Sequence, residues 1–108
     1  MKRTVYLTRQ AGIDLMELHS HLSEHDSPEK ADRVLFRIEQ AISVLADSSQ
    51  RGAVPSELGS AGEREVRQIH FKPYRIVYEV LPDRAIILLV ADGRRDLQSL
   101  LLRRLLSR

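Results

Sequence analysis

The chain has 108 residues, enough for one domain with a modest hydrophobic core, and we expect a single domain over residues 1–108. It contains no cysteine, which excludes disulfides and thiolate catalysis, and no apolar stretch long enough to span a bilayer, so we expect a cytoplasmic protein without a membrane partner. The formal net charge is only +2, but the isoelectric point is about 9.3 and most basic residues are arginines, which favours an acidic or polyanionic partner.

The first half of the chain predicts a short strand and two helices. Residues 3–8 (RTVYLT) are β-like, and Thr8 is placed to cap a helix. The apolar stripe of this helix consists of Ala11, Leu15, Leu18 and Leu22. Ser27 as N-cap and Pro28 at the first helical position predict a second helix, which ends before Gly52. Because the connector SEHDSP is short, the two helices should form an antiparallel hairpin.

The second half predicts a loop, three strands and a final helix. Residues 49–63 are rich in Gly, Ser and Pro, which is typical of a surface loop. The strands are expected at residues 64–71, 74–81 and 84–92. Short turns join them, so they should form an antiparallel meander, and the last strand is apolar enough to lie centrally. Residues 93–108 predict a helix with an unusually wide apolar face.

The order β-α-α-β-β-β-α predicts an α+β fold of two layers. We expect an antiparallel sheet with the N-terminal helical hairpin on one face and a C-terminal helix. With the helices mainly on one face, the other face should be open to a ligand or partner. Strand alternation places Arg75, Val77 and Glu79 on this open face.

Arginine side chains are predicted to gather around the open face as a target-binding cluster. Arg67 lies on the strand preceding Arg75, and Arg94 and Arg95 follow the last strand. Arg94 and Arg95 are expected to open the final helix, where cations oppose the macrodipole, an unfavourable placement that indicates a function. The structural alternative for Arg75 is an ion pair with Glu79 or another acidic neighbour.

Two further features have both structural and functional interpretations. His21 and His25 have the spacing of metal ligands, with His19 nearby, but no third ligand is evident, so we expect solvated side chains and neither a metal nor a cofactor. Leu102 and Leu106 lie beside the main stripe of the final helix. Such leucines are commonly core, and the alternative is burial against a partner protein or a second protomer.

Several segments together resemble the RelE/ParE superfamily of bacterial toxins from type II toxin–antitoxin systems, the plasmid-stabilisation type. They are PYRIVYEV, IILLVADGRRDLQSLL, YLTRQAGIDLMELHSHL, SPEKADRVLFRIEQAISVL and RGAVPSELG, so the likeness covers nearly the whole chain. The resemblance implies a small sheet with two N-terminal helices and a toxin that arrests growth. It also implies a cognate antitoxin as partner, with DNA contacted only through the antitoxin.

The superfamily divides by target. RelE-like toxins cut messenger RNA on the ribosome with a basic cluster and a tyrosine, because attack by a 2′-hydroxyl needs a base, a cation and an acid. Arg75 and Arg95 match arginines of that cluster and would be catalytic in a ribonuclease. The family's lysines and tyrosine, however, correspond to Val66, Gln68 and Leu101. The resemblance therefore favours ParE-like inhibition of DNA gyrase over ribosome-dependent cleavage, and a non-toxic nucleic-acid-binding module is a weaker alternative.

Overall fold

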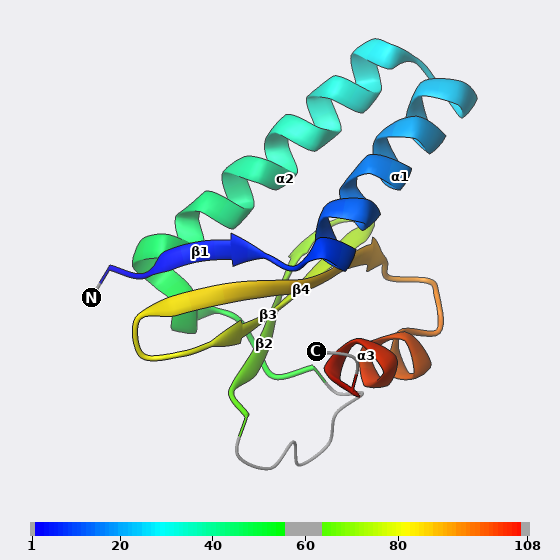
Figure 1. Ribbon diagram of the computed structural model, residues 1–108. Helices are drawn as coiled ribbons and strands as arrows, with labels where there is room; N and C mark the ends of the chain where they lie inside the picture. The colour runs from blue at the N-terminus through cyan, green and yellow to red at the C-terminus, as the bar shows by residue number, and fades with distance from the viewer. Residues whose placement is uncertain (1, 56–63, 107–108) are drawn as a thin grey trace.

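The computed structural model describes residues 2–55 and 64–106, and its elements follow the predicted order (Figure 1). They are β1 (Thr4–Leu7), α1 (Arg9–His25), α2 (Pro28–Ser48), the 3-10 turn η1 (Ser49–Arg51), β2 (Val66–Phe71), β3 (Tyr74–Val80), β4 (Arg84–Asp92) and α3 (Leu97–Leu106). The predicted α+β class is confirmed. Of the predicted loop at 49–63, residues 56–63 lie outside the described residues. Within the described ranges, no helix is long and apolar enough to cross a bilayer.

Local capping fixes the starts of the two N-terminal helices. The Thr8 hydroxyl accepts a hydrogen bond from the Ala11 backbone N–H at 3.1 Å, and the Ser27 hydroxyl accepts one from the Lys30 N–H at 3.1 Å. Pro28 occupies the first turn of α2, where its missing N–H costs nothing. Both predicted caps are therefore confirmed, and each contributes about 1 kcal/mol.

The sheet has the strand order β1-β4-β3-β2. The β2–β3 and β3–β4 pairs are antiparallel, as the short turns predict. β1 instead pairs parallel with β4, with Thr4 opposite Arg84, because α1 and α2 intervene between β1 and the other strands. The sheet is thus mixed, and β4 lies inside it, as its nearly continuous apolar sequence predicts.

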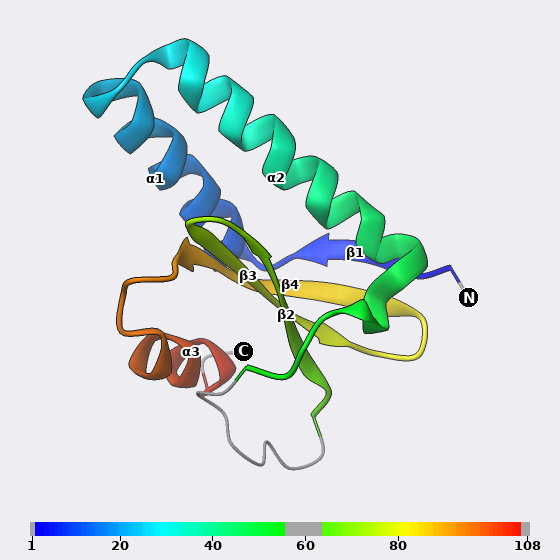
Figure 2. The same cartoon turned by 180° about the vertical axis from the view of Figure 1, so that it is seen from behind.

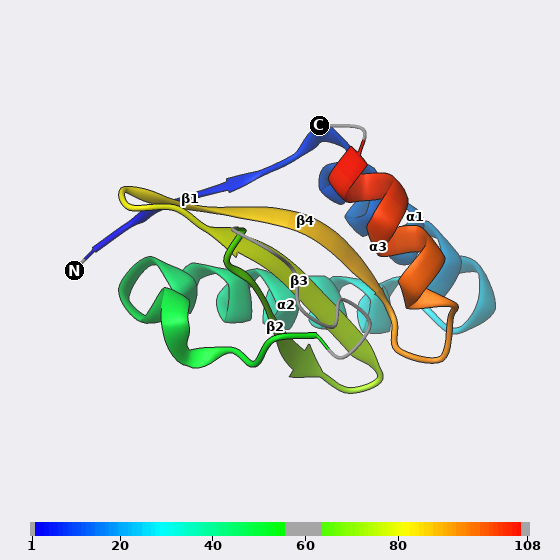
Figure 3. The same cartoon turned by 90° about the horizontal axis from the view of Figure 1, so that it is seen from below.

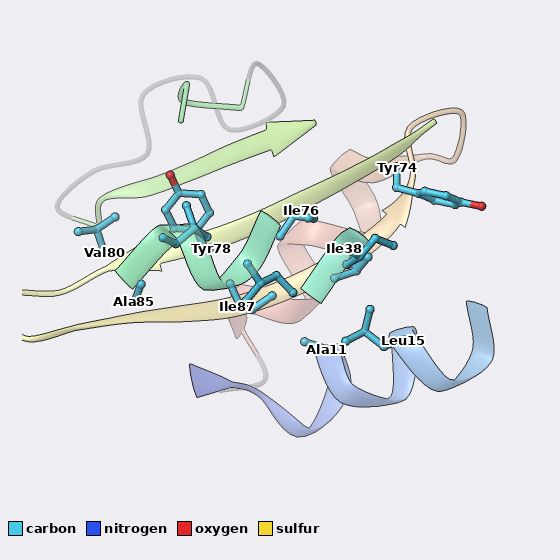
Figure 4. Close-up of a cluster of buried hydrophobic side chains, with 12 residues drawn as sticks. Ala11, Leu15, Ile38, Tyr74, Ile76, Tyr78, Val80, Ala85 and Ile87 are labelled. Carbon is cyan, nitrogen blue, oxygen red and sulfur yellow. The ribbon is translucent and has the colours of Figure 1, made fainter. Parts of the chain in front are cut away.

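α1 and α2 cover one face of the sheet and form the larger core cluster (Figures 2 and 4). Its buried members are Ala11, Leu15, Ile38, Ile42, Leu45, Tyr74, Ile76, Tyr78, Val80, Ala85, Ile87 and Val90. Tyr74, Ile76 and Tyr78 share this face because side chains alternate along β3. Burying each large apolar side chain stabilises the fold by about 1.5–3 kcal/mol.

Tyr78 brings a buried hydroxyl into this core. Its hydroxyl donates to the Ser49 carbonyl at 2.6 Å and accepts from the Gly52 N–H at 3.2 Å. Burial raises the pKa of Tyr78, so the phenol stays protonated and able to donate. These bonds hold the segment after α2 against the sheet, and the next residue, Ala53, pairs with Gln68 as an isolated bridge.

α3 packs on the opposite face of the sheet (Figures 2 and 3) and forms a second cluster. The buried members of this cluster are Val66, Val77, Leu88, Leu89, Ala91, Leu97, Leu100 and Leu101. The expectation of an open face is therefore wrong along much of β3, where Val77 and Glu79 are both buried. The wide apolar face of α3 explains this, since part of it covers these strand residues. A β-bulge opposite Val77 and Tyr78 lets both Leu88 and Leu89 join the cluster.

Candidate functional site

Arg75 lies at the start of β3, at the end of the sheet where β4 runs into the loop before α3. Its side chain is half-buried, and its Nε donates to Oε1 of Gln68 at 2.6 Å, with Nη2 bonded to the same oxygen. The stem of Arg75 passes Gly93, where an added Cβ would lie 3.3 Å from Arg75 Cδ. The Gln68 side chain thus holds the guanidinium toward β2, and Gly93 leaves room for the Arg75 stem.

His70 is a neighbour of Arg75 that the sequence analysis missed. The β2–β3 register sets His70 directly opposite Arg75, and directly opposed residues of an antiparallel pair share a face. The His70 side chain is exposed. Counting back from the tight turn at Lys72 and Pro73 would have identified this pairing, because a short turn fixes the register of its strands.

Arg67 does not share the face of Arg75, and the expectation that it would is wrong. The register places Arg67 opposite Tyr78, so it projects from the helix-covered side of the sheet. There its Nε donates to a carboxylate oxygen of Glu65 at 2.8 Å, and its Nη1 donates to the Gly52 carbonyl at 2.7 Å. Arg75 lies opposite His70, and Arg67 is three residues before His70 on β2. Because side chains alternate along a strand, the two guanidinium groups project from opposite faces of the sheet.

Arg94 and Arg95 lie in the loop between β4 and α3, so the expectation that they open the helix is wrong. Asp96 instead caps α3 by accepting a hydrogen bond from the Ser99 N–H at 3.3 Å. Because Arg94 and Arg95 precede this cap, their charges are not placed unfavourably in the first turn of the helix. Arg94 pairs with Asp92 at 2.7 Å, and its side-chain and backbone hydrogen bonds lower the pKa of Asp92 to about 2. Among the described residues, the exposed Arg95 side chain has no ion-pair partner.

A cleft of about 570 Å³ opens between α1 and this end of the sheet. We call it the α1 cleft, and it is lined by Asp14, Glu17, Leu18, His21, Leu22, Pro73, Tyr74, Val90, Ala91, Asp92, Arg94 and Arg95. Burial, followed by the charge of Asp92, raises the pKa of Tyr74, so its phenol is a neutral donor at the wall. Arg94 and Arg95 thus line the cleft, whereas the Arg75 guanidinium is bonded toward β2. The four arginines therefore do not converge as predicted. Arg75, Arg94 and Arg95 share one end of the sheet, and Arg67 lies on the other face.

The C-terminal helix separates its leucines into buried and exposed sets. Leu97, Leu100 and Leu101 are buried in the second cluster, while Leu102 is 47% exposed and Leu106 is 84% exposed. Two exposed leucines one turn apart on a helix form an apolar surface that the described fold leaves uncovered. The structure therefore puts both predicted antitoxin-binding residues on the accessible side of α3.

An ion pair that the sequence analysis did not anticipate fixes the end of α3. Arg64 donates to both carboxylate oxygens of the buried Glu79, the shorter bond being 2.7 Å, and also to the Leu105 carbonyl at 3.3 Å. The hydrogen bond to Glu79 raises the pKa of Arg64 and keeps it charged. Glu79, predicted on an open face, is instead buried on β3 and holds the guanidinium of Arg64, which also bonds the end of α3.

The helical-hairpin histidines have ordinary protein partners. His19 Nε2 lies 2.7 Å from a carboxylate oxygen of Asp32 on α2. The rings of His21 and His25 contact each other at a tilt of 41°, with their centroids 4.3 Å apart. Over residues 2–55 and 64–106, no three His, Cys, Asp or Glu side chains are grouped so that they could hold a metal ion.

Comparison with known proteins identifies a matching family and several similar solved structures. Residues 5–97 match the family described as the ParE toxin of the type II toxin–antitoxin system parDE. A search of curated proteins finds no match. Among solved structures, the chain is similar to the chromosomal ParDE toxin–antitoxin system from P. aeruginosa, with 22% identity, a TM-score of 0.69, and coverage of 84% of this chain and 96% of that chain. At this identity the structural likeness establishes the fold.

Proposed function

The chain belongs to the ParE toxin family of type II toxin–antitoxin systems, and from this premise we propose that it arrests bacterial growth in the cytoplasm by inhibiting DNA gyrase. The family match covers residues 5–97, which includes both N-terminal helices, all of the sheet except Thr4, and the loop that carries Arg94 and Arg95. The proposed inhibition is stoichiometric binding and involves no chemical step by the toxin.

The burial of two side chains is the observation that carries this choice of target. In the RelE-like ribonucleases that this chain resembles, a lysine and a tyrosine stand at the positions that correspond to Val66 and Leu101. Val66 is 2% exposed and Leu101 is 1% exposed, and both belong to the cluster beneath α3. Neither can supply a proton donor or acceptor to a bound RNA, so the charge set that phosphodiester cleavage needs is incomplete.

We assign target binding to Arg75 and Arg95, at the end of the sheet where β3 begins and β4 ends. A guanidinium offers a planar fork that grips two oxygens of a carboxylate or phosphate, and Gln68 holds that fork in place at Arg75. Arg95 is exposed and has no ion pair within the described residues, so its charge is available to a target surface. Arg94 contributes less because Asp92 already neutralises it, and Arg67 belongs to the other face.

The cognate antitoxin is the proposed partner of α3. Leu102 and Leu106 present an uncovered apolar surface, and burying them against a partner removes that area from water. This assignment explains why α3 has more leucines than the small core beneath it uses.

Ribosome-dependent cleavage of messenger RNA remains the second candidate because of His70. An imidazole opposite Arg75 on an exposed strand surface provides one group that can move a proton near a guanidinium. A single histidine beside one arginine still lacks the second proton-transfer group, which is why gyrase is the first proposal.

The two functions separate in purified assays. Gyrase, relaxed plasmid and ATP without ribosomes should lose supercoiling activity when the protein is added in slight molar excess over gyrase. A parallel reaction with ribosomes programmed with a defined messenger RNA should show no new cleavage products. Uninhibited gyrase together with cuts in the ribosome-bound message would replace the first proposal with the second.

A further inference from the structure

α1 uses one face to hold the fold together and exposes the other. On its inner face, Ala11 and Leu15 are buried in the larger core cluster. Arg104 of α3 also donates to both carboxylate oxygens of Asp14, at 2.8 and 2.7 Å. On the outer face, Met16 is 70% exposed. Figure 1 shows the connected ends of α1 and α2 extending beyond the sheet, so the described part of the chain leaves this outer face uncovered.

Two hollows of about 420 and 450 Å³ lie on either side of Met16 on this outer face. Met16 and Ser20 line both of them, while Ile13 lines only the first and Gly12 and Leu35 line only the second. The second hollow is open beside Gly12, because nothing lies within 4 Å of a Cβ added there. Met16 is therefore a knob between two holes, the arrangement through which helices pack against each other.

The apolar surface around Met16 continues onto α2. His19 Nε2 lies 2.7 Å from a carboxylate oxygen of Asp32, and this register of the antiparallel hairpin sets Met16 level with Leu35. Leu35 lines the second hollow, and the adjacent Phe36 is exposed. We call Met16, Leu35 and Phe36 the hairpin patch. Contiguous exposed apolar side chains of this kind mark surfaces that bind another protein.

The outer stripe of α1 has opposite charges at its two ends. Spacings of three and four residues place on this stripe Arg9, Ile13, Met16, Ser20 and Glu24. Arg9 and Glu24 are exposed, and neither has an ion-pair partner among the described residues. They are fifteen residues apart, which is about 22 Å along the helix. A stripe with a cation at one end and an anion at the other is complementary to itself when it is turned around.

We propose that two copies of this chain associate through the hairpin patch, with the two α1 helices antiparallel. A two-fold axis that passes between Met16 and Glu17 sets Arg9 of each copy opposite the partner's Glu24, since both positions are equally far from the axis. Met16 of each copy then enters a hollow of the other. The same patch serves both copies, as the symmetry of a dimer requires.

Other occupants fit this surface less well. Glu17, Glu24 and Glu39 border the two hollows and would repel the phosphates of a nucleic acid. The proposed antitoxin surface at Leu102 and Leu106 is on α3, which packs on the opposite face of the sheet (Figure 2). The dimer therefore leaves that surface accessible and presents two copies of it. The inference does not depend on gyrase as the target.

Sedimentation equilibrium of the purified free toxin tests the inference. A single helical face is smaller than a standard interface, so we expect a reversible dimer with a dissociation constant on the order of 10 µM. Met16→Glu brings two like charges together at the axis and should raise this constant at least tenfold. Val44→Glu is the matched control, because Val44 is exposed on α2 and borders neither hollow. It should dimerise within twofold of the wild type.

A charge swap tests the antiparallel register. Arg9→Glu and Glu24→Arg should each weaken the dimer severalfold, because either change sets like charges opposite each other at both ends of the interface. The variant that combines both changes restores opposite charges and should recover the wild-type dissociation constant. Arg84→Glu, an exposed charge reversal at the start of β4, should have no effect. Circular dichroism checks each fold, and the swap keeps the test valid if Met16→Glu unfolds.

Single cysteines report the contact directly, because the chain contains none of its own. Mild oxidation should link Met16→Cys into a disulfide-bonded dimer and leave Val44→Cys monomeric. A wild type that stays monomeric far above the expected dissociation constant would overturn the inference, and so would a dimer that neither Met16→Glu nor the charge swap alters. A monomeric toxin that loses antitoxin binding through Met16→Glu would also overturn it and would assign the hairpin patch to the antitoxin.

Gyrase inhibition is read separately on the same proteins. Uninhibited gyrase together with a dimer that these variants weaken refutes the proposed target alone. Inhibited gyrase together with a monomeric toxin refutes the dimer alone.

Discussion

Gly93 packs against the side chain of Arg75, so closely that an added Cβ would lie 3.3 Å from Arg75 Cδ and 3.3 Å from the Pro73 carbonyl oxygen. The Gly93 N–H also donates to that carbonyl at 2.8 Å, which leaves the loop little room to retreat. The loop after β4 therefore packs directly against Pro73 and Arg75 at the start of β3. The position of the Arg75 guanidinium depends on both.

Gly93→Ala should displace the Arg75 stem and weaken the toxin without unfolding it. We expect a loss of stability of about 1 kcal/mol from overpacking and a several-fold loss of growth inhibition. Gly12→Ala is the control, because nothing lies within 4 Å of the added Cβ and alanine favours a helix by about 1 kcal/mol. Urea unfolding and growth assays of both variants measure this. Equal gains of stability in the two would show that the Gly93 contact is unimportant.

The Asp14–Arg104 ion pair should dominate the attachment of α3. Asp14 also accepts from the Val90 N–H at 3.0 Å, and both side chains of the pair are at least 86% buried, with 9% and 14% of their surface exposed. Asp14→Ala leaves a buried guanidinium without this carboxylate and should cost about 3–5 kcal/mol in urea unfolding. Asp26→Ala, which breaks the exposed pair with Lys30, should cost less than about 1 kcal/mol. Similar losses in both variants would contradict this account of α3.

Replacing Leu102 and Leu106 with Ser should weaken the antitoxin complex far more than it lowers the melting temperature of the free toxin. Both side chains are largely exposed, so their loss removes little from the core, whereas an interface would lose two apolar contacts. Calorimetric titration and thermal melting of the same double variant measure the two effects. Leu97→Ser is the contrasting variant. Because Leu97 is buried, its replacement should lower the free energy of unfolding by about 2–5 kcal/mol, as core truncations do. A collapsed fold in the Leu102 and Leu106 variant would mean that these leucines are core.

Asp92 should give the stability a pH dependence in acid. Its folded-state pKa is lowered to about 2 by the hydrogen bonds from Arg94, below its ordinary value of 3.8. A depressed carboxyl pKa contributes stability that is complete above the unfolded pKa and is lost as the pH falls from about 4 to about 2. The difference in free energy of unfolding between the wild type and Asp92→Asn should therefore be constant above pH 5 and shrink toward pH 2. A constant difference down to pH 2 would exclude this coupling.

What the sequence predicts well here is determined locally. Thr8 and Ser27 cap their helices with neighbours three residues away, and the apolar period of each helix follows from the same short range. Strand alternation along β3 correctly separated Tyr78 from Val77. These features need no knowledge of distant contacts.

What the sequence missed depends on pairings between distant residues. The apolar stripe of α3 predicts that the helix packs, but not against which face, and that choice buries Val77 and Glu79. The face of Arg67 depends on the β2–β3 register, which alternation within one strand does not supply. The bidentate bonds of Arg64 to Glu79 likewise join residues that no local spacing connects. The sequence therefore correctly predicted Arg75 as a strand residue and wrongly predicted that Arg67 shares its face, whereas Arg94 and Arg95 lie in the loop at the same end of the sheet.

The most direct test of gyrase inhibition through Arg75 is a supercoiling titration with purified gyrase and no ribosomes. Arg75→Ala should raise the concentration for half inhibition at least tenfold while the variant stays folded and bound to its antitoxin. Arg75→Lys should fall between, because it keeps the charge and loses the planar fork. Arg33→Ala, on the exposed side of α2, should match the wild type. Inhibition by Arg75→Ala at wild-type concentrations would contradict the account and make Arg75 a structural residue.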